Sequence, residues 1–437
     1  MIEKWLYNCL ALPLGLAGAR LLGLVNEKVK SSFYVRRDLF SQLEKSLSGL
    51  GEGKRVLVHI SSVGEYLQAR AVLRAFKEKM PGWKRILSFF SPSLEPMLKK
   101  GAEAELVSYL PFDCPSQVQR FLELLNPSLL IFSCYDLWPN LIWQAKSRGI
   151  KVILINASLG ENSFKLNPLV SWWFRRIYDQ LDLILCASPQ DRERILQLGI
   201  NPTKVFTTGN TRFEETIRRI AQISPEDELL KKLRSWKRGF CLVVGSSWEE
   251  DEQVLIPALE KIWKQKKELF LILAPHEPKL ERVAKLKDIF SRLGQNPLLL
   301  SELEEFSGRD FPRGSVIIED RVGRLYKLYQ LGEVAFVGGS FRREVHNVME
   351  PAGFGLPVLL GPKIRNSQEA LELVFRGGAK IVQDSDQFCQ ELVLLMENEE
   401  QRKEMGKRSR ELVEENQGAV KKTLEKIFEF CPEVRED

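Results

Sequence analysis

The sequence has few of the residues that commonly carry catalysis or bind metals. Only three histidines occur in 437 residues, and the seven cysteines are scattered without any C-x-x-C pair. This pattern argues against a zinc site and against a redox-active dithiol. A G-x-x-x-x-G-K-[ST] loop is also absent, and no Ser-His-Asp set has a convincing context. The sequence therefore predicts no metal site and no P-loop.

An excess of one charge is missing as well. The 64 Lys and Arg residues nearly balance the 58 Asp and Glu residues, which leaves a net charge of +6. A nucleic-acid-binding stripe would be more basic, so no nucleic-acid partner is expected; the mild excess suits an anionic membrane face or a phosphorylated ligand. With 44% hydrophobic and 28% charged residues the chain is globular. Its length predicts two domains.

One long apolar run stands out, at the N-terminus. Trp5–Ala19 is largely apolar, and Leu21–Val25 extends the run beyond Arg20. A helix needs about 20 apolar residues to span a bilayer. By the positive-inside rule the downstream chain stays in the cytoplasm, because basic residues follow the run. We expect residues 1–26 to form a membrane anchor or a helix in the membrane plane; the alternative is a buried first helix of a soluble domain.

Short apolar strands alternate with amphipathic helices in two blocks, and such alternation predicts parallel, doubly wound sheets. In the first block the predicted strands are 55–60, 85–90, 128–132, 151–156, 183–187 and 205–208. In the second block they are 240–245, 269–274, 316–319, 334–338 and 357–360. The sequence thus predicts an α/β protein with two Rossmann-like domains.

The two blocks define the expected domain boundaries. The first domain is predicted at 27–218 and the second at 236–400, with a charged linker at 219–235 and a helical tail at 401–437. If the two sheets face each other, a cleft lies between the carboxyl ends of their strands, where ligands of open α/β sheets bind.

The most informative motif lies in the second block. The strand Val334–Val337 ends in Gly338-Gly339-Ser340, and His346, Asn347 and Glu350 follow on what we expect to be the first turn of a helix. Free backbone N–H groups at a helix start suit a phosphate. A carboxylate at Glu350 could accept hydrogen bonds from two ribose hydroxyls. An ordinary strand-to-helix loop with a capping Asn is the alternative.

A carboxylate also follows the first strand of the first block, in the segment His59-Ile60-Ser61-Ser62-Val63-Gly64-Glu65. Glu65 at the carboxyl end of a strand could remove a proton from an attacking hydroxyl. The alternative is that Glu65 only interacts favourably with the dipole of the helix it begins.

Two further polar segments are ambiguous. Arg324, after the strand at 316–319, could bind a phosphate or carboxylate with both guanidinium nitrogens, or could be a solvated residue at a helix start. Asp384-Ser385-Asp386 has the look of an acidic metal motif, but we expect it to cap the helix at Gln387.

The order of motifs along the chain resembles the 3-deoxy-D-manno-octulosonic acid (Kdo) transferases. The segments that carry the resemblance are HISSVGE, YDLWPNLI, INASL, TTGNTRFE, GSSWEEDE, LAPHEP, DRVGRLYKLY and the HNVMEPAGFGLPVLLGP segment. They cover nearly the whole chain.

The resemblance implies a metal-independent glycosyltransferase of the GT-B fold, with no cofactor other than the donor substrate CMP-Kdo. The acceptor would be the lipid A precursor, so the protein would lie at the cytoplasmic face of the inner membrane. Glu65 matches the family's general base. The residues that match nucleotide contacts are Pro275, His276, Val322, Gly323, Arg324, Asn347, Val348, Met349 and Glu350.

The chain also departs from the family pattern. Cys134 stands where the family has a Glu thought to stabilise the transition state, and Arg212 replaces a Lys. Arg324 reverses the charge of a Glu, and Glu344-Val345 replaces two glycines before His346. These changes leave two alternatives open: a GT-B transferase that uses a different nucleotide sugar, and a catalytically weakened homologue that serves as a scaffold.

Overall fold

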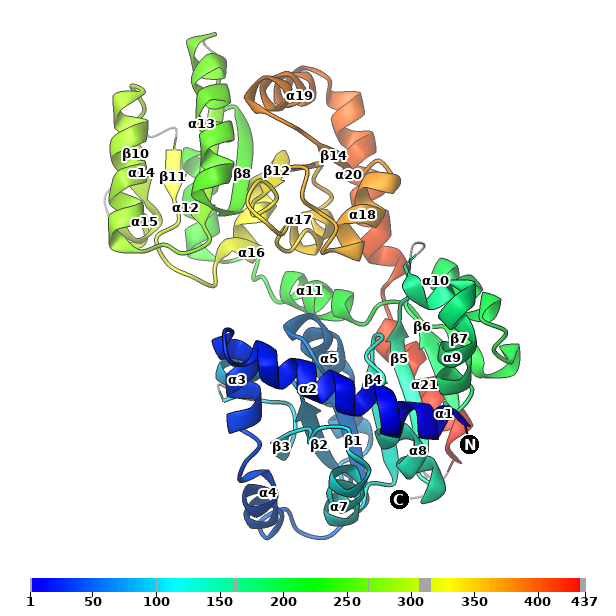
Figure 1. Cartoon of the computed structure of the whole chain (residues 1–437). Helices are drawn as coiled ribbons and strands as arrows, with labels where there is room; N and C mark the ends of the chain where they lie inside the picture. The colour runs from blue at the N-terminus through cyan, green and yellow to red at the C-terminus, as the bar shows by residue number, and fades with distance from the viewer. Residues whose placement is uncertain (1, 100, 161–162, 266, 306–315, 433–437) are drawn as a thin grey trace. The chain divides into compact units, whose positions relative to one another are not determined.

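The computed structural model describes residues 2–99, 101–160, 163–265, 267–305 and 316–432. The chain forms two compact units (Figure 1). Unit 1 comprises Met1–Glu215 together with Gly418–Asp437, and unit 2 comprises Thr216–Gln417. Each unit contains one seven-stranded sheet. The predicted fold class, two parallel α/β sheets with an N-terminal apolar helix, is confirmed.

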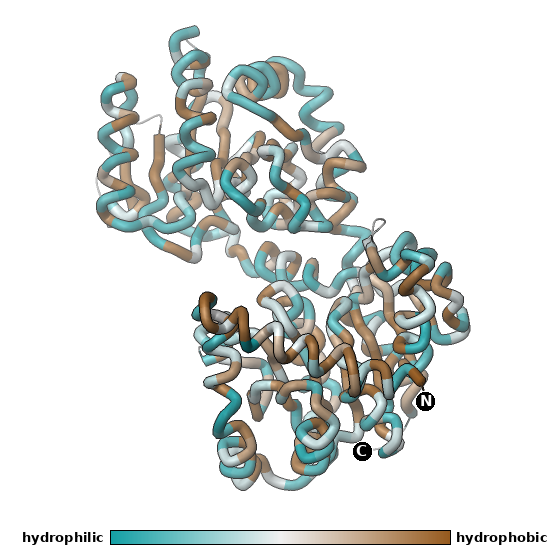
Figure 2. The backbone as a smooth tube through the Cα atoms, in the orientation of Figure 1, coloured by the Kyte–Doolittle hydropathy of each residue, from teal (hydrophilic) through white to brown (hydrophobic). Residues whose placement is uncertain are grey.

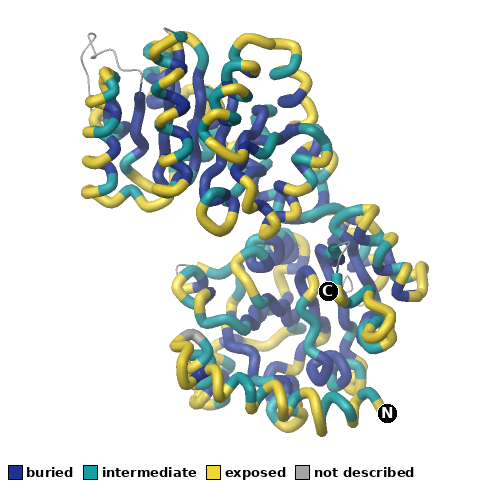
Figure 3. Tube along the Cα trace, turned by 45° about the horizontal axis from the view of Figure 1, so that its top comes forward, coloured by how far each residue is buried: buried dark blue, intermediate teal, exposed yellow. Residues whose placement is uncertain are grey.

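The sheet of unit 1 has the strand order β3-β2-β1-β4-β5-β6-β7, and every neighbouring pair is parallel. The strands are β1 (Arg55–Ile60), β2 (Lys84–Phe89), β3 (Leu106–Tyr109), β4 (Leu129–Ser133), β5 (Lys151–Ala157), β6 (Leu183–Cys186) and β7 (Val205–Thr207). Most of their residues are buried, because helices cover both faces (Figure 3). The sequence analysis missed β3, which has only four residues and an exposed Val107.

Helices of unit 1 pack on both faces of this sheet, over two separate clusters of buried apolar side chains. They are α3 (Glu27–Tyr34), α4 (Leu39–Leu47), α5 (Val63–Lys79), α6 (Glu95–Leu98), α7 (Pro115–Leu125), α8 (Pro139–Ser147), α9 (Pro168–Tyr178), α10 (Pro189–Gln197), α11 (Arg212–Ala221), which continues into unit 2, and α21 (Ala419–Phe430). The last of these packs on α5, where the rings of Phe76 and Phe428 are 6.2 Å apart. The predicted tail is therefore divided between the units: residues 418–437 belong to unit 1.

The sheet of unit 2 has the order β10-β11-β9-β8-β12-β13-β14, again with parallel neighbours only. The strands are β8 (Phe240–Ser247), β9 (Leu269–Pro275), β10 (Pro297–Leu299), β11 (Val316–Ile318), β12 (Val334–Val337), β13 (Val358–Leu360) and β14 (Ala379–Ile381). The three-residue strand β10 was not predicted from the sequence.

The helices of unit 2 are α12 (Glu228–Trp236), α13 (Glu249–Lys264), α14 (Leu280–Arg292), α15 (Leu300–Glu305), α16 (Leu325–Leu328), α17 (Met349–Gly353), α18 (Gln368–Phe375), α19 (Ser385–Glu397) and α20 (Glu399–Glu415). The predicted linker at 219–235 is not a loose connection. Its helix α12 buries Leu229, Leu230 and Leu233 in the core of unit 2, so the charged pattern reflects only the solvent face of a packed helix.

Side-chain caps begin several helices as the sequence indicated. Ser62 accepts from the Glu65 N–H at the start of α5, and Ser188 accepts from the Asp191 N–H at the start of α10. Asp384 accepts from the Gln387 N–H, which confirms the capping interpretation of that acidic segment. For α12 the cap is Asp227.

The N-terminal segment is helical from Ile2 to Leu22 as α1 (Ile2–Leu6), a π-helical turn η1 (Tyr7–Ala11) and α2 (Leu12–Leu22). These 21 residues are long and apolar enough to cross a membrane (Figure 2). None of them is buried in the fold. The alternative of a buried first helix is therefore wrong, and the expected membrane anchor or in-plane helix stays a prediction.

Candidate functional site

The candidate residues gather where the strand order of each sheet reverses direction. In unit 1, the chain leaves β1 toward β2 on one side and later adds β4 on the other side of β1. In unit 2, β8 and β12 have the same relation. Loops that leave two such neighbouring strands diverge to opposite faces of the sheet and open a crevice at the strand carboxyl ends, where open α/β sheets bind ligands.

Glu65 lies in the first turn of α5, directly beyond β1. Its side chain is 4% exposed, and its Oε2 accepts the Ser61 N–H at 2.5 Å. Burial raises the pKa of Glu65 to about 7; the bond from Ser61 lowers it, and the charge of Asp136 raises it further. Glu65 therefore satisfies a backbone N–H at the helix start, and its raised pKa suits proton transfer near neutral pH. Its role as general base stays a prediction.

Asp136 brings a second carboxylate to the same place, from the loop after β4. The Ser61 Oγ–H donates to Asp136 Oδ2, a contact between residues 75 positions apart in the chain. His59 Nε2 lies 3.3 Å from Ser61 Oγ, and His59 Nδ1 lies 3.0 Å from Ser88 Oγ. Burial lowers the pKa of His59 to about 3, so its imidazole is neutral. In the sequence, Asp136 is visible only as part of an altered motif, and the one signal of a functional role is its position just beyond a strand.

Cys134, at the position of the family's Glu, begins the loop that carries Asp136. The residue is 8% exposed and has φ of +74°. This left-handed conformation is unfavourable for a residue with a Cβ atom. It turns the chain away from β4, and the Cys134 N–H still donates to the Ile155 carbonyl at 2.9 Å. A catalytic role for Cys134 stays a prediction.

Arg212 begins α11, and the loop before it is fastened to two elements of unit 1. Asn156, at the end of β5 with φ of +51°, accepts from the Thr211 N–H at 2.8 Å. The Thr211 hydroxyl lies 2.8 Å from the Gln68 carbonyl, one turn beyond Glu65 in α5. The contacts bring Arg212 and Glu65 to the same edge of the sheet. The role of Arg212 in stabilising charge stays a prediction.

In unit 2 a cluster of rings and one cation lies beyond β8, β9 and β12. The Trp248 Nε1–H donates to His346 Nε2 at 2.8 Å, and the His276 ring is stacked on His346 at 4.1 Å with 9° between planes. The Arg342 guanidinium lies 3.8 Å from the centre of the Trp248 ring. Burial, His276 and Arg342 together lower the pKa of His346 to about 4, so this imidazole is neutral and its other nitrogen carries the proton.

Asp251 and Gly339 hold this cluster in place. Asp251 is fully buried and accepts from the backbone N–H groups of Trp248, Gly339 and Phe341 at 2.9, 2.7 and 3.1 Å. Gly339 has φ of +86°, and a Cβ atom there would lie 2.1 Å from the Glu344 carbonyl oxygen and 3.0 Å from the His346 ring. Sequence reasoning found Gly339 and two histidines but missed Trp248, Arg342 and Asp251.

The segment predicted to start a phosphate-binding helix needs correction. The helix α17 begins only at Met349 and has five residues, so His346 and Asn347 lie in the preceding loop. The Asn347 side chain accepts from the Met349 N–H at 3.1 Å. Val348 and Met349 are buried, which leaves only their backbone for a ligand.

Glu350, in the first turn of α17, pairs with Arg219 of α11. Its carboxylate, 9% exposed, accepts from Arg219 at 3.3 Å. Burial raises its pKa, and the positive charge of Arg219 partly offsets this effect. A ribose contact from Glu350 stays a prediction.

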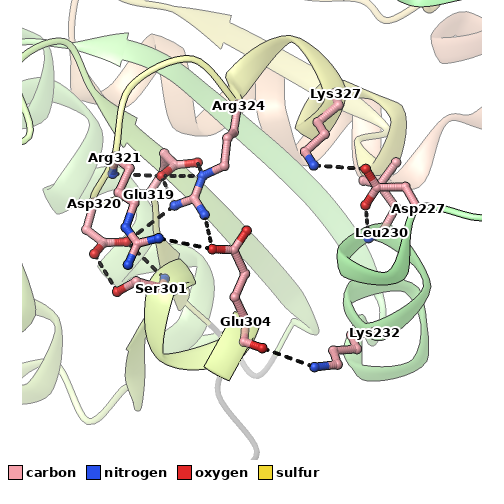
Figure 4. A network of polar contacts seen from close by, with 10 residues as sticks. All are labelled: Asp227, Leu230, Lys232, Ser301, Glu304, Glu319, Asp320, Arg321, Arg324 and Lys327. Atoms are coloured by element: carbon pink, nitrogen blue, oxygen red, sulfur yellow. Dashed lines mark hydrogen bonds and ion pairs between the residues drawn. The ribbon is translucent and has the colours of Figure 1, made fainter. Parts of the chain in front are cut away.

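Arg324 is neither a solvated residue nor an unpaired ligand for phosphate. Figure 4 shows its guanidinium between acidic side chains: it bonds to Glu319 through Nε at 2.9 Å and lies 2.5 Å from Glu304 and 3.6 Å from Asp320. Arg324 and Glu319 are both largely buried, at 15% and 3% side-chain exposure. The charge reversal relative to the family is thus compensated inside unit 2.

The other predicted nucleotide contacts lie at the same edge of the sheet. Pro275 is the buried last residue of β9, and His276 follows it on the exposed side. Val322 is 77% exposed, and Gly323 has φ of +98° in the loop after β11.

Comparisons with known proteins agree with the motif order. Residues 32–215 match the model of the 3-Deoxy-D-manno-octulosonic-acid transferase (kdotransferase) family. A 3-deoxy-D-manno-octulosonic acid transferase of Chlamydophila psittaci is 27% identical over 390 residues, which cover 88% of this chain and 87% of the relative. One from Haemophilus influenzae is 26% identical over 384 residues, with 85% and 86% covered.

Solved structures with little sequence similarity share the fold. A UDP-GlcNAc 2-epimerase from Neisseria meningitidis aligns with a TM-score of 0.59 at 14% identity, covering 86% of this chain and all of the other. A glycosyltransferase from Rickettsia africae aligns with a TM-score of 0.53 at 13% identity, covering 87% and 99%. At such low identity these structures indicate the two-sheet GT-B type of fold and nothing about the ligand.

Proposed function

Because this chain belongs to the family of 3-deoxy-D-manno-octulosonic acid (Kdo) transferases, we propose that it transfers Kdo from CMP-Kdo to a sugar hydroxyl of the lipid A precursor. The observation that carries the proposal within the fold is Glu65: a buried carboxyl group at the β1–β4 crevice with a pKa of about 7. The reaction needs one group that accepts the proton of the acceptor hydroxyl, and Glu65 has both the place and the proton affinity.

In the proposed reaction Glu65 takes the proton while the acceptor oxygen bonds to the anomeric carbon of Kdo. The bond between that carbon and the CMP oxygen breaks, and its electron pair leaves with the phosphate. The anomeric centre passes through an oxocarbenium-like state, as in other glycosyl transfers. An oriented carboxylate base accounts for about 10²–10⁴-fold in rate.

Unit 2 is proposed to hold the donor. Its crevice offers the Glu350 carboxylate for the ribose hydroxyls, as the family resemblance implies. Arg342 supplies positive potential for the departing phosphate, the role that a metal has in other transferases. The transfer is accordingly proposed to need no metal and no cofactor.

The direct test is to incubate the protein with CMP-Kdo and lipid A precursor in EDTA, and to detect Kdo-bearing product by mass spectrometry. We expect product with wild type and about 10²–10⁴-fold less with Glu65→Gln. Wild-type protein that forms no Kdo-bearing product contradicts the proposal, and product that requires added metal contradicts its metal-independent form.

A GT-B transferase with a different nucleotide sugar is the second candidate. The observation that favours it is the altered donor side of unit 2, where Arg324 is paired with Glu319 and a tryptophan joins the two histidines. Calorimetry with CMP, UDP and GDP separates the candidates: tightest binding of CMP supports the Kdo donor, whereas clear preference for UDP supports the alternative.

A weakened homologue is the third candidate, motivated by Cys134. If the missing Glu limits turnover, Cys134→Glu raises Kdo transfer above that of wild type. A wild type that is already active, with no gain in the variant, argues against this candidate.

The N-terminal helix supports a proposed location at the membrane. Tyr7 donates to Asp113 at 2.9 Å and its ring is stacked on Trp173 at 5.9 Å, and Asn8 exchanges two hydrogen bonds with Asn140 at 3.1 and 2.7 Å. These contacts fasten the helix along the folded part of unit 1. The helix also exposes the large apolar residues Trp5, Leu10 and Leu14. The helix α9 exposes two more, Leu169 and Trp172.

We therefore propose that this apolar face lies on the cytoplasmic surface of the inner membrane, with the helix in the membrane plane. A lipid acceptor would then reach the protein without leaving the bilayer. Trp5→Asp with Leu14→Asp should reduce sedimentation with anionic vesicles. Phe375→Asp, which removes an even more exposed apolar side chain from unit 2, should not. Equal sedimentation of both variants contradicts the proposed face.

A further inference from the structure

Glu65 is not the only acidic group of its crevice, and this inference rests on the proposed role of Glu65 as base. Ser61 connects Glu65 to Asp136: the Ser61 N–H bonds to Glu65 Oε2 at 2.5 Å, and the Ser61 hydroxyl bonds to Asp136 Oδ2. One serine therefore holds two carboxylates that come from different strands of the sheet.

We propose that Asp136 is a positioning residue for Glu65, which fixes Ser61 against the Glu65 carboxylate and places a second negative charge beside it. Asp136 exchanges no proton and touches no reacting bond. Its charge makes Glu65 a stronger base, because a neighbouring anion favours protonation of a carboxylate. Through Ser61 it also limits where the Glu65 oxygens can point.

The direction of the hydrogen bonds supports this assignment. Ser61 has one hydroxyl proton, and the Asp136 carboxylate can only accept it. A hydrogen bond between Ser61 Oγ and His59 Nε2, 3.3 Å away, then requires His59 to be the donor, with its proton on Nε2. Burial keeps His59 neutral, so only one of its ring nitrogens carries a proton. Ser88, His59 and Ser61 thus form a row of polar contacts that ends with the Ser61 hydroxyl donating to Asp136.

Other titratable groups face the pair from three further elements. Lys165 lies in the turn η3 (Phe164–Leu166), and its Nζ donates to the Tyr135 carbonyl at 2.8 Å. Burial lowers the pKa of Lys165, and the charge of Asp136 partly offsets this effect. Asp113 and Tyr7 interact electrostatically with Asp136, and Tyr135 interacts with both Glu65 and Asp136. Lys165 weakens the field of Asp136, and Asp113 strengthens it when ionised.

Position 134 makes the arrangement particular to this chain. A Glu at that position would bring another carboxylate to the loop between β4 and α8, whereas Cys134 is a neutral side chain in a left-handed turn. In this chain the loop therefore presents the Asp136 carboxylate to Ser61, beside a neutral residue at position 134.

The test measures the Glu65 carboxyl group directly. Protein labelled with ¹³C at the Glu side-chain carboxyl carbon is titrated by NMR, and the Glu65 signal is identified by its loss in Glu65→Gln. Asp136→Asn keeps an acceptor oxygen for Ser61 but removes the charge. We expect the titration midpoint of Glu65 to fall by about one pH unit in this variant and to return toward wild type in Asp136→Glu.

The acidic limb of kcat/KM against pH should move with the titration midpoint. Asp182→Asn is the matched control: this carboxylate also belongs to unit 1, but it pairs with Lys146 at the amino ends of the strands. It should leave the Glu65 midpoint unchanged. Ser61→Ala, which frees Asp136 from the pair, should lower the midpoint by less than Asp136→Asn does.

The outcomes separate this inference from the proposed function. A Glu65 midpoint that does not change in Asp136→Asn overturns the positioning role, even in an active Kdo transferase. A shifted midpoint in a protein without Kdo transfer retains the coupling of Asp136 to Glu65 and overturns the proposed reaction instead.

Discussion

The crevice of unit 1 and the crevice of unit 2 occupy the same topological position and are built from opposite chemistry. In unit 1 the crevice holds two carboxylates joined through a serine: the buried Glu65 and the partly buried Asp136, both bonded to Ser61. In unit 2 it holds exposed or half-buried rings beside a cation: Trp248, His346 and Arg342.

The difference shows how one sheet topology serves two tasks. Burial beside like charge raises the proton affinity of a carboxylate, which suits a group that must accept a proton. In unit 2, burial and the neighbouring His276 and Arg342 lower the pKa of His346 and keep its imidazole neutral, so that Arg342 is the cation left to receive an anion. Four predictions test this contrast, in order of decreasing effect.

Glu65→Gln should have the largest effect, a loss of about 10²–10⁴-fold in kcat, because the proton acceptor is removed while its hydrogen bond to Ser61 can persist. Steady-state kinetics with saturating donor measure this. A loss that lies entirely in the acceptor KM would assign Glu65 to binding and remove the contrast between the two crevices.

Gly339→Ala should destabilise unit 2 by about 2–4 kcal/mol, because the added Cβ would collide with the Glu344 carbonyl and the His346 ring. Gly294→Ala is the control: its φ is also positive, at +73°, but no atom lies within 4 Å of the new Cβ. Urea unfolding followed by fluorescence compares the two. If both variants lose the same stability, the close packing of the ring cluster has no energetic weight.

The stability of Glu65→Gln should depend on pH in a defined direction. The folded pKa of Glu65, about 7, lies above the ordinary value of 4.5. The protonated carboxyl therefore contributes stability in full below about pH 4.5, and this contribution is lost as the pH rises through 7. At pH 8 the variant should be more stable than wild type by about 3 kcal/mol, with no difference at pH 4.

The free energy of unfolding of wild type and Glu65→Gln, measured at both pH values, checks this trend. The control is Glu123→Gln, which removes an exposed carboxylate that pairs with Arg148. A variant less stable than wild type at pH 8 would show that the Glu65 carboxylate is stabilised by its surroundings, contrary to the proposed strong base.

Arg342→Ala should have the smallest effect, a rise of about tenfold in donor KM with kcat nearly unchanged, since a charge-assisted contact to an anion is lost. Arg292→Ala is the control and should leave donor KM unchanged. Arg292 is an exposed arginine on α14, and its one ion pair within the described part of the chain is with Asp288. An unchanged KM in Arg342→Ala would leave the ring cluster without a role in donor binding.

Much of the fold could be predicted because its signals are local. The strands at Arg55–Ile60 and Lys151–Ala157 are apolar on both faces, and the helix at Pro115–Leu125 begins with a proline and follows a regular apolar spacing. The short strands β3 and β10 have too few residues to show a pattern. The linker was misjudged because a charged surface pattern does not reveal the three buried leucines beneath it.

The site was predictable only in part. Glu65 and Glu350 follow strands or glycine loops, where a carboxylate is conspicuous. Arg324 also follows a strand, yet its guanidinium is paired with buried carboxylates, because Glu304 comes from a separate helix whose position no local pattern predicts.

The sequence by itself determined that apolar strands and amphipathic helices alternate in two blocks, and that Glu65 lies just beyond the first strand, because hydrophobic periodicity and helix caps act over a few residues. Only the tertiary structure decided that Ser61 meets Asp136 and that Trp248 meets His346, across 75 and 98 residues of chain. The pairing of parallel strands places such loops side by side, and burial between them then sets the proton affinity of Glu65.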